Sequence, residues 1–206
     1  AAVSTLISTI LGSLIAVALS RYKFRGSEGI NLFLVLPLTT PEIVLGSSLA
    51  TLFLGQTFID FGMVTIIIAH IMFQVSFVAL TVRARIRGFD WTLEQAAQDL
   101  GATPMRTFMK VTFPLILPGI LAAALLAFAL SIDDFIITFF NSGPIQTFPL
   151  QIYGASRVRI PPQINVLASI ILFFSVAILM TGTIAGMRKS AQKQATAKKF
   201  KLPLRK

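Results

Sequence analysis

Five long apolar blocks constrain the fold of this chain more than any other feature. A helix rises about 1.5 Å per residue, so each block is long enough to cross the roughly 30 Å hydrocarbon core of a bilayer. The chain is 55% hydrophobic and 13% charged, as expected of a membrane protein. The sequence therefore predicts an all-α, polytopic membrane helix bundle with five spans, approximately Ala2–Ser20, Ile30–Leu54, Phe61–Val82, Leu115–Phe140 and Ile164–Gly186.

The basic residues predict the orientation of these spans. All of the 18 Lys and Arg residues except Arg157 and Arg159 lie in three segments, 21–25, 83–110 and 188–206. Loops on the cytoplasmic side of a membrane carry an excess of Lys and Arg. We therefore expect these three segments, and with them the C-terminus, to lie in the cytoplasm.

The same pattern predicts the domain organisation. A transmembrane domain is expected over residues 1–186, with a cytoplasmic loop at 83–114, and a basic cytoplasmic tail at 187–206. The net charge of +10 follows from this topology, so we expect no nucleic-acid partner, and the tail is expected to lie on anionic lipid. The chain has no cysteine, which excludes disulfides and thiolate metal sites.

The cytoplasmic loop is predicted to fold as a helix, a tight turn and a second helix. Thr92 is placed to cap the first helix, and Gln95 is placed to reach back to the cap amide. Gly101 suits a left-handed residue at the end of that helix, and Thr103-Pro104 suits the start of the next. Ala96-Ala97 favours helix and leaves a smooth surface. The loop therefore has the character of a docking surface for another protein.

The spacing of this loop resembles that of the permease subunits of ATP-binding-cassette importers. Their coupling loop reads Glu-Ala-Ala, three residues, Gly, nine residues, then Ile-x-Leu-Pro, and Gln95-Ala96-Ala97, Gly101 and Val111-x-Phe113-Pro114 follow that spacing. Gln95, Val111 and Phe113 replace the family's Glu, Ile and Leu, and Glu94 is the neighbouring acid. The resemblance implies that Glu94, Gln95, Ala96, Ala97 and Gly101 couple the chain to an ATPase. The alternative is an ordinary amphipathic loop helix.

Further motifs are similar to those of the second permease in the spermidine/putrescine transport family. They are Tyr22-x-Phe24-Arg25-Gly26, the run 130–138 with Gly143-Pro144, Phe148-Pro149-Leu150-x-Ile152-Tyr153, and Pro162-x-Ile164-Asn165-x-Leu167. The resemblance implies import of a polyamine through the inner membrane by alternating access. It also implies three partners, namely ATP-binding subunits, a second homologous permease and an extracytoplasmic solute-binding protein. Six spans are typical of the family, so we expect one more helix upstream of Ala1.

No catalytic role is expected for the chain itself. It has no Gly-x4-Gly-Lys-Ser/Thr loop to bind the phosphates of ATP, so no cofactor is expected in this chain and ATP is expected to bind the partner subunit.

Four ionisable residues fall inside the predicted spans: Glu42, His70, Asp133 and Asp134. Such residues are unfavourable in hydrocarbon and commonly mark a substrate or ion pathway. Glu42, Asp133 and Asp134 are therefore candidates for the substrate path. Measured along the helix from its cytoplasmic end, Glu42 is expected at about 18 Å and the aspartates at about 28 Å. The sequence offers no buried basic residue to pair with these acids, which leaves room for a mobile cation.

Helical periodicity ranks the two aspartates. At 100° per residue, Asp134 falls near the centre of a stripe of small residues and Asp133 falls just beyond its edge. Membrane helices use such stripes for close packing. The stripe consists of Gly119, Ala123, Ala127 and Ser131. The alternative, left open, is that the aspartates cap the outer helix turn or bind amides in the loop at 141–144.

Three other positions have simple structural interpretations. His70, four residues before Gln74, is predicted to form an interhelical hydrogen bond rather than a metal site. Trp91 and Phe89 are predicted to anchor the cytoplasmic interface. Pro41 is predicted to kink its helix and to expose backbone carbonyl groups.

Other functional classes fit the sequence less well. An intramembrane aspartyl protease needs two carboxylates that face each other, whereas Asp133 and Asp134 point about 100° apart on one helix. An ion-coupled secondary carrier has a use for the acids but none for a docking loop. The remaining alternatives are an importer permease for a different small solute and a purely structural assembly subunit.

Overall fold

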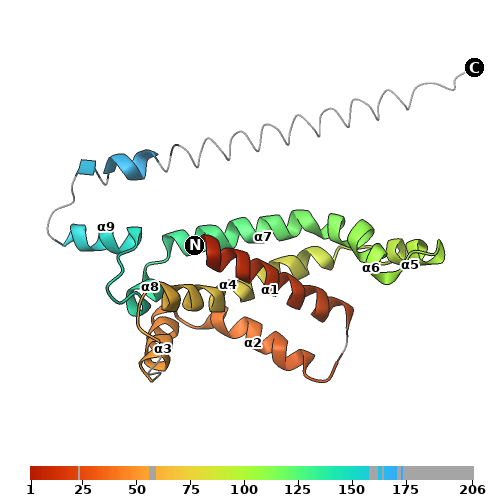
Figure 1. The fold of residues 1–206 in the computed structure, drawn as a ribbon, viewed down its shortest axis with the longest axis horizontal. Helices are drawn as coiled ribbons and strands as arrows, with labels where there is room; N and C mark the ends of the chain where they lie inside the picture. The colour runs from red at the N-terminus through yellow and green to blue at the C-terminus, as the bar shows by residue number, and fades with distance from the viewer. Residues whose placement is uncertain (23, 56–58, 158–161, 164, 171–172, 174–206) are drawn as a thin grey trace, which may run out of the picture. The chain divides into compact units, whose positions relative to one another are not determined.

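The computed structural model describes residues 1–22, 24–55, 59–157, 162–163, 165–170 and 173, which form helices and short connections without a strand (Figure 1). The helices are α1 (Ala2–Arg21), α2 (Ser27–Thr39), α3 (Glu42–Leu54), α4 (Met63–Ile86), α5 (Thr92–Asp99), α6 (Pro104–Thr107), the π-helical turn η1 (Phe108–Thr112), α7 (Phe113–Asp133), α8 (Ile136–Asn141) and α9 (Phe148–Ser156). Contacts divide the chain into two units, Ala1–Gln151 and Ile152–Lys206. The candidate functional residues lie in the first.

Helices α1, α4 and α7 pack against one another within this first unit. Gly12 lets α1 approach α4 closely, because a Cβ atom at this position would lie only 2.7 Å from the Cβ of Val78. Such small residues at contacts allow membrane helices to gain packing interactions. The buried apolar core of the three helices consists of Ala16, Val78, Val82, Ile86, Ile116, Ala123 and Ala127.

The predicted small-residue stripe of α7 is confirmed. Ala123, Ala127 and Ser131 are buried, whereas Leu121 and Phe128 on the other side of the helix are exposed. The helix thus presents its small residues to protein and its large apolar residues outward, as expected for a helix surrounded partly by lipid.

The described residues include three helices long and apolar enough to span a membrane, Ala2–Arg21, Met63–Ile86 and Pro104–Asp133, and up to four if α2 and α3 count as one broken span. The all-α membrane architecture is therefore confirmed. The predicted fifth span, Ile164–Gly186, lies largely outside the described residues, and the tail at 187–206 lies entirely outside them.

The prediction of one continuous second span, Ile30–Leu54, is wrong. Helices α2 and α3 meet at an angle of 110°. Thr40 between them has an extended backbone, with φ −79° and ψ 131°. A residue before proline is driven from helical to extended geometry, and Pro41 has no N–H to continue the helical hydrogen bonding. The expected kink at Pro41 is therefore a sharp break.

The prediction of a continuous helix over Leu115–Phe140 is also wrong. Helix α7 ends at Asp133, Asp134 has φ −60° and ψ 122°, and α8 begins at Ile136. The Oδ2 atom of Asp134 accepts a hydrogen bond from the backbone N–H of Thr138 at 2.8 Å. The carboxylate thus satisfies an amide in the first turn of α8, which supports a new helix start in place of a continued α7.

Candidate functional site

The two helix breaks meet at one cavity of about 400 Å³. Three carboxylates (Glu42, Asp133 and Asp134) and three aromatic rings (Phe73, Phe77 and Phe135) line it, together with Pro37, Leu38, Thr40, Leu45, Leu130, Ile136 and Ile137. None of these described lining residues is Lys or Arg. Small-molecule sites in proteins typically measure roughly 300–1,000 Å³, so the volume suits a small organic solute.

The three predicted path residues therefore lie around one cavity. The expectation that Glu42 lies about 10 Å deeper than the aspartates rests on helical rise alone. That expectation treated each block as a straight helix, whereas α2 and α3 meet at 110° and α7 ends at Asp133. The two breaks bring residues about ninety positions apart in sequence to the same cavity wall.

Four helix termini contribute to this wall. The C-terminal ends of α2 and α7 and the first turns of α3 and α8 all supply lining residues. Backbone groups at helix termini have no partner within their helix, and in a membrane they are tolerated where they face protein or water. The cavity therefore brings helix ends and carboxylates together within otherwise apolar helices.

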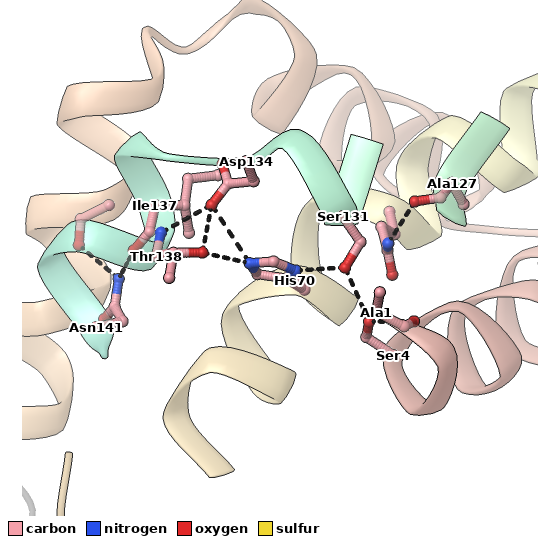
Figure 2. A network of polar contacts seen from close by, with 11 residues as sticks. Ala1, Ser4, His70, Ala127, Ser131, Asp134, Ile137, Thr138 and Asn141 are labelled. Atoms are coloured by element: carbon pink, nitrogen blue, oxygen red, sulfur yellow. Dashed lines mark hydrogen bonds and ion pairs between the residues drawn. The ribbon is translucent and has the colours of Figure 1, made fainter. Parts of the chain in front are cut away.

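Figure 2 shows the contacts of the Asp134 carboxylate with Thr138 and His70. Its Oδ2 atom accepts hydrogen bonds from the Thr138 backbone N–H at 2.8 Å and from Thr138 Oγ1 at 2.7 Å. Its side chain is only 6% exposed. Asp134 thus satisfies an amide near a helix end and also lines the cavity. The amide is that of Thr138, not one of the amides at 141–144 named in the alternative prediction.

His70 lies between α7 and α8 at the centre of this network (Figure 2). Its Nδ1 atom is 2.6 Å from Ser131 Oγ and its Nε2 atom is 2.9 Å from Thr138 Oγ1, which confirms the predicted interhelical hydrogen bond. Thr138 donates its single hydroxyl hydrogen to Asp134, so the contact with Thr138 requires a hydrogen on Nε2. That Nε2 atom also lies 3.3 Å from Asp134 Oδ2.

The expectation that no basic group accompanies the acids is therefore wrong for Asp134. In the sequence, His70 stands closest to Gln74 of its own helix, and only folding brings its imidazole to Asp134 at the end of α7. No group of three metal-ligating residues occurs among the described residues.

The interhelical contacts of two buried polar residues in this region, Ser8 and Gln74, were not predicted from the sequence. Gln74, which is 0% exposed, accepts a hydrogen bond from Ser8 Oγ at 3.0 Å and donates one to the carbonyl of Ala127 at 2.7 Å. Gln74 thereby joins α1, α4 and α7. The available signal was the presence of polar Ser8 and Gln74 inside apolar blocks, because polar groups at such depth need partners.

The second candidate site is the loop predicted to be cytoplasmic, at residues 83–114, whose predicted turn is confirmed. Gly101 has φ +84°, and the Thr103 side chain accepts a hydrogen bond from the Arg106 backbone N–H at the start of α6. The predicted capping box is wrong. The first backbone N–H of α5, that of Thr92, donates a hydrogen bond to Asp90 Oδ1 at 3.0 Å, so Thr92 does not cap the helix. Hydrogen bonds from the Thr92 side chain and then its backbone lower the pKa of Asp90.

One side of the loop is open to a partner. Gln95, Ala96 and Gly101 are exposed, and two neighbouring apolar side chains are among the most exposed of the described residues, with Leu100 89% and Met105 71% exposed. We call these five residues the loop face. Exposed apolar residues beside a smooth helix commonly mark a protein interaction site.

Glu94 does not belong to the loop face. It is 8% exposed, forms an ion pair with Arg21 and accepts a hydrogen bond from Thr112. Helical geometry accounts for this, since adjacent residues on a helix point about 100° apart and Gln95 outward places Glu94 inward. Glu94, which the resemblance places among the coupling residues, therefore faces the interior of the protein.

Comparisons with known proteins decide the family. Residues 8–191 match the family of binding-protein-dependent transport system inner membrane components. The chain belongs to this family. It is 41% identical over 179 residues to the putrescine transport system permease protein PotI of Escherichia coli K12, covering 84% of the chain and 64% of PotI. The chain therefore spans less than two thirds of the length of PotI.

Two further relatives of this family are spermidine/putrescine transport system permease proteins PotC. The chain is 36% identical over 188 residues to that of Escherichia coli K12, covering 91% of the chain and 71% of the relative. It is 35% identical over 175 residues to that of Haemophilus influenzae, covering 84% and 68%. Family membership and the apolar helices identify the chain as a multi-pass component of the inner membrane, and the named relatives are transport permeases.

Proposed function

We propose that this chain is a permease subunit of an ATP-driven importer of polyamines. Its partners in this proposal are ATP-binding subunits, a second homologous permease and an extracytoplasmic solute-binding protein, and its C-terminus lies in the cytoplasm. Membership of the transport family and similarity to PotI and PotC support the proposal. The observation that carries it is the cavity with three carboxylates.

The cavity chemistry favours a small organic polycation. Alkyl amines of the lysine type have pKa values near 10 and are protonated at neutral pH, so they attract carboxylates. Aromatic faces also attract cations within about 6 Å. Glu42, Asp133 and Asp134 supply the carboxylates, while Phe73 and Phe77 supply aromatic surface. Methylene groups between the amines of a polyamine suit the apolar remainder of the lining.

In this proposal, the loop face receives the motion that ATP binding drives in the ATPase subunit. An ATPase subunit docks on Gln95, Ala96 and Gly101, and its closure around ATP moves α5. The span Pro104–Asp133 runs from the loop to the cavity, where it ends beside Asp134. A displacement of the loop is therefore transmitted along α7 to the wall that carries the aspartates, and the cavity opens alternately to each side of the membrane.

The test is uptake of labelled putrescine and spermidine by cells that lack this subunit, complemented with the full-length protein and its complete partner set. We expect accumulation that depends on ATP and on the ATPase subunit. Uptake driven by a proton gradient without any nucleotide-binding subunit would instead establish an ion-coupled carrier. If the complex takes up another solute with ATP but no polyamine, only the assignment of polyamine as substrate would be wrong.

Gly101→Val is expected to uncouple transport from ATP hydrolysis. A left-handed backbone at φ +84° is unfavourable by roughly 1–2 kcal/mol for an ordinary residue and more for a β-branched one. We expect at least about a tenfold loss of uptake per ATP hydrolysed. Gly101→Asn is the matched control, because Asn tolerates this conformation, and it should stay close to wild type. Equal uptake per ATP by the Val variant and wild type would contradict a role for this turn.

A further inference from the structure

Arg21, the last residue of α1, joins that helix to the cytoplasmic loop. Its guanidinium forms an ion pair with Glu94 Oε1, and its Nη2 atom lies 3.4 Å from Thr112 Oγ1. The Thr112 hydroxyl also donates to Glu94 Oε1. One carboxylate oxygen thus connects the end of α1, helix α5 and the turn η1.

Aromatic rings hold the guanidinium in this position. The Cζ atom of Arg21 lies 5.7 Å from the ring centroid of Trp91 and 5.6 Å from that of Phe108. Both distances are within the range of cation–π attraction. Phe89 packs edge-on against Trp91 at 4.9 Å, which fixes that ring in turn. Trp91 and Phe89 thereby acquire a specific role in the loop, beyond the interface anchoring predicted from the sequence.

The opposite end of α1 contacts the cavity network. Ser4 Oγ lies 3.3 Å from Ser131 Oγ, which is 2.6 Å from His70 Nδ1, and His70 contacts Asp134 (Figure 2). Helix α1 therefore touches the loop through Arg21 and the Asp134 network through Ser4. Between these ends it packs along α4 without a break.

We propose that Arg21 and Glu94 form a positioning pair that makes α1 move together with the docking helix α5. The loop then has two connections to the cavity, one along α7 and one along α1. This inference rests on the proposed function, because it requires that an ATPase displaces the loop. It also explains why Glu94 is buried beside the loop face rather than exposed on it.

Helices α1 and α5 are expected to move together because the charges that join them are largely buried. The pair is largely shielded from water, so it is screened less than a surface ion pair, and loss of one partner leaves the other charge buried without compensation. A displacement of α5 that left α1 behind would separate these charges. The two helices therefore move together at lower free energy than apart, which is the condition for transmitting a motion between sites.

The first experiment measures polyamine uptake per ATP hydrolysed by the complete transport complex in proteoliposomes. The variants are Arg21→Glu, Glu94→Arg and the double reversal. Each single change places like charges together, so we expect at least a tenfold loss of uptake per ATP. The double reversal restores the opposite charges but not the cation–π contacts with Trp91 and Phe108, so it should recover part of the uptake. Arg21→Lys keeps the charge but loses the planar contacts, and it should be intermediate. Arg25→Glu changes an exposed arginine nearby and serves as control.

The outcomes separate the two proposals. Absence of ATP-driven uptake by wild-type complexes would contradict the proposed function itself. Wild-type uptake together with unchanged uptake per ATP in both single variants would overturn the positioning pair alone. A loss that the double reversal does not recover even in part, in complexes that assemble normally, would also overturn the pairing.

A second measurement remains informative if the charge variants fail to assemble. The chain has no cysteine, so Tyr22→Cys and Thr92→Cys allow spin labels to be attached at just these two exposed positions of the chain. The distance between the labels reports the separation of the C-terminal end of α1 from α5. We expect this distance to stay constant when ATP binds to the complete complex. Distances measured from labels placed on the cavity side should change. A change in the Tyr22 to Thr92 distance on ATP binding would show that α1 does not follow the loop.

Discussion

Asp134→Asn is expected to reduce polyamine uptake by about ten- to a hundredfold while leaving the subunit assembled in its complex. The Asn side-chain oxygen can still accept from the Thr138 backbone N–H, so the start of α8 is preserved. The negative charge at the cavity is lost. Hydrogen bonds to charged groups contribute about 1.5–3 kcal/mol, which corresponds to the stated range.

The matched control for this prediction is Asp60→Asn, the same chemical change at an exposed residue that does not line the cavity. It should transport like wild type. The measurement is initial-rate uptake of labelled spermidine, with the amount of assembled complex determined in parallel. If Asp134→Asn assembles and transports normally, Asp134 only supports the helix break, and Glu42 and Asp133 bind the cation.

Gly12→Leu is expected to prevent normal packing of α1. A Cβ atom at this position would lie 2.7 Å from Val78 Cβ and 2.9 Å from the Val75 carbonyl oxygen, closer than real Cβ atoms approach. The helices would have to separate, which also pulls Ser8 away from Gln74. Overpacking and the lost hydrogen bond together give a destabilisation of about 2–4 kcal/mol.

Thermal unfolding of the purified complex in lipid provides the measurement. Gly29→Leu is the control, because a Cβ atom there meets nothing within 4 Å and the residue is exposed. We expect a marked fall in the melting temperature for Gly12→Leu and little change for Gly29→Leu. Equal melting temperatures for the two variants would show that α1 and α4 are not held together by this close contact.

Features that depend on local chemistry could be predicted from the sequence. Apolar blocks of sufficient length predict spanning helices, and Gly101 followed by Thr103-Pro104 predicts the turn of the loop, because few residues suit a left-handed conformation. Periodicity correctly identified the buried side of α7 at Ala123 and Ala127. It also ranked Asp134 above Asp133 for burial, as the structure has it.

Features that depend on the direction of the chain after a break could not be predicted. Pro41 signals a kink, but the sequence contains no measure of its angle, and the 110° bend changes where Glu42 lies. The end of α7 at Asp133 was likewise not signalled, because an apolar run continues beyond it. Both errors had the same origin, the assumption that an apolar run of this length is one straight helix.

The sequence by itself determined the family, the membrane-spanning character and the separation into a basic loop and apolar helices, since these follow from hydrophobicity, charge and short motifs. Only the tertiary structure decided which polar groups meet. It placed Glu42, Asp133 and Asp134 around one cavity, brought His70 to Asp134 and turned Glu94 inward to Arg21. The physical reason is that a buried polar group must find its partner in space, and partners distant in sequence become neighbours only through helix breaks and helix packing.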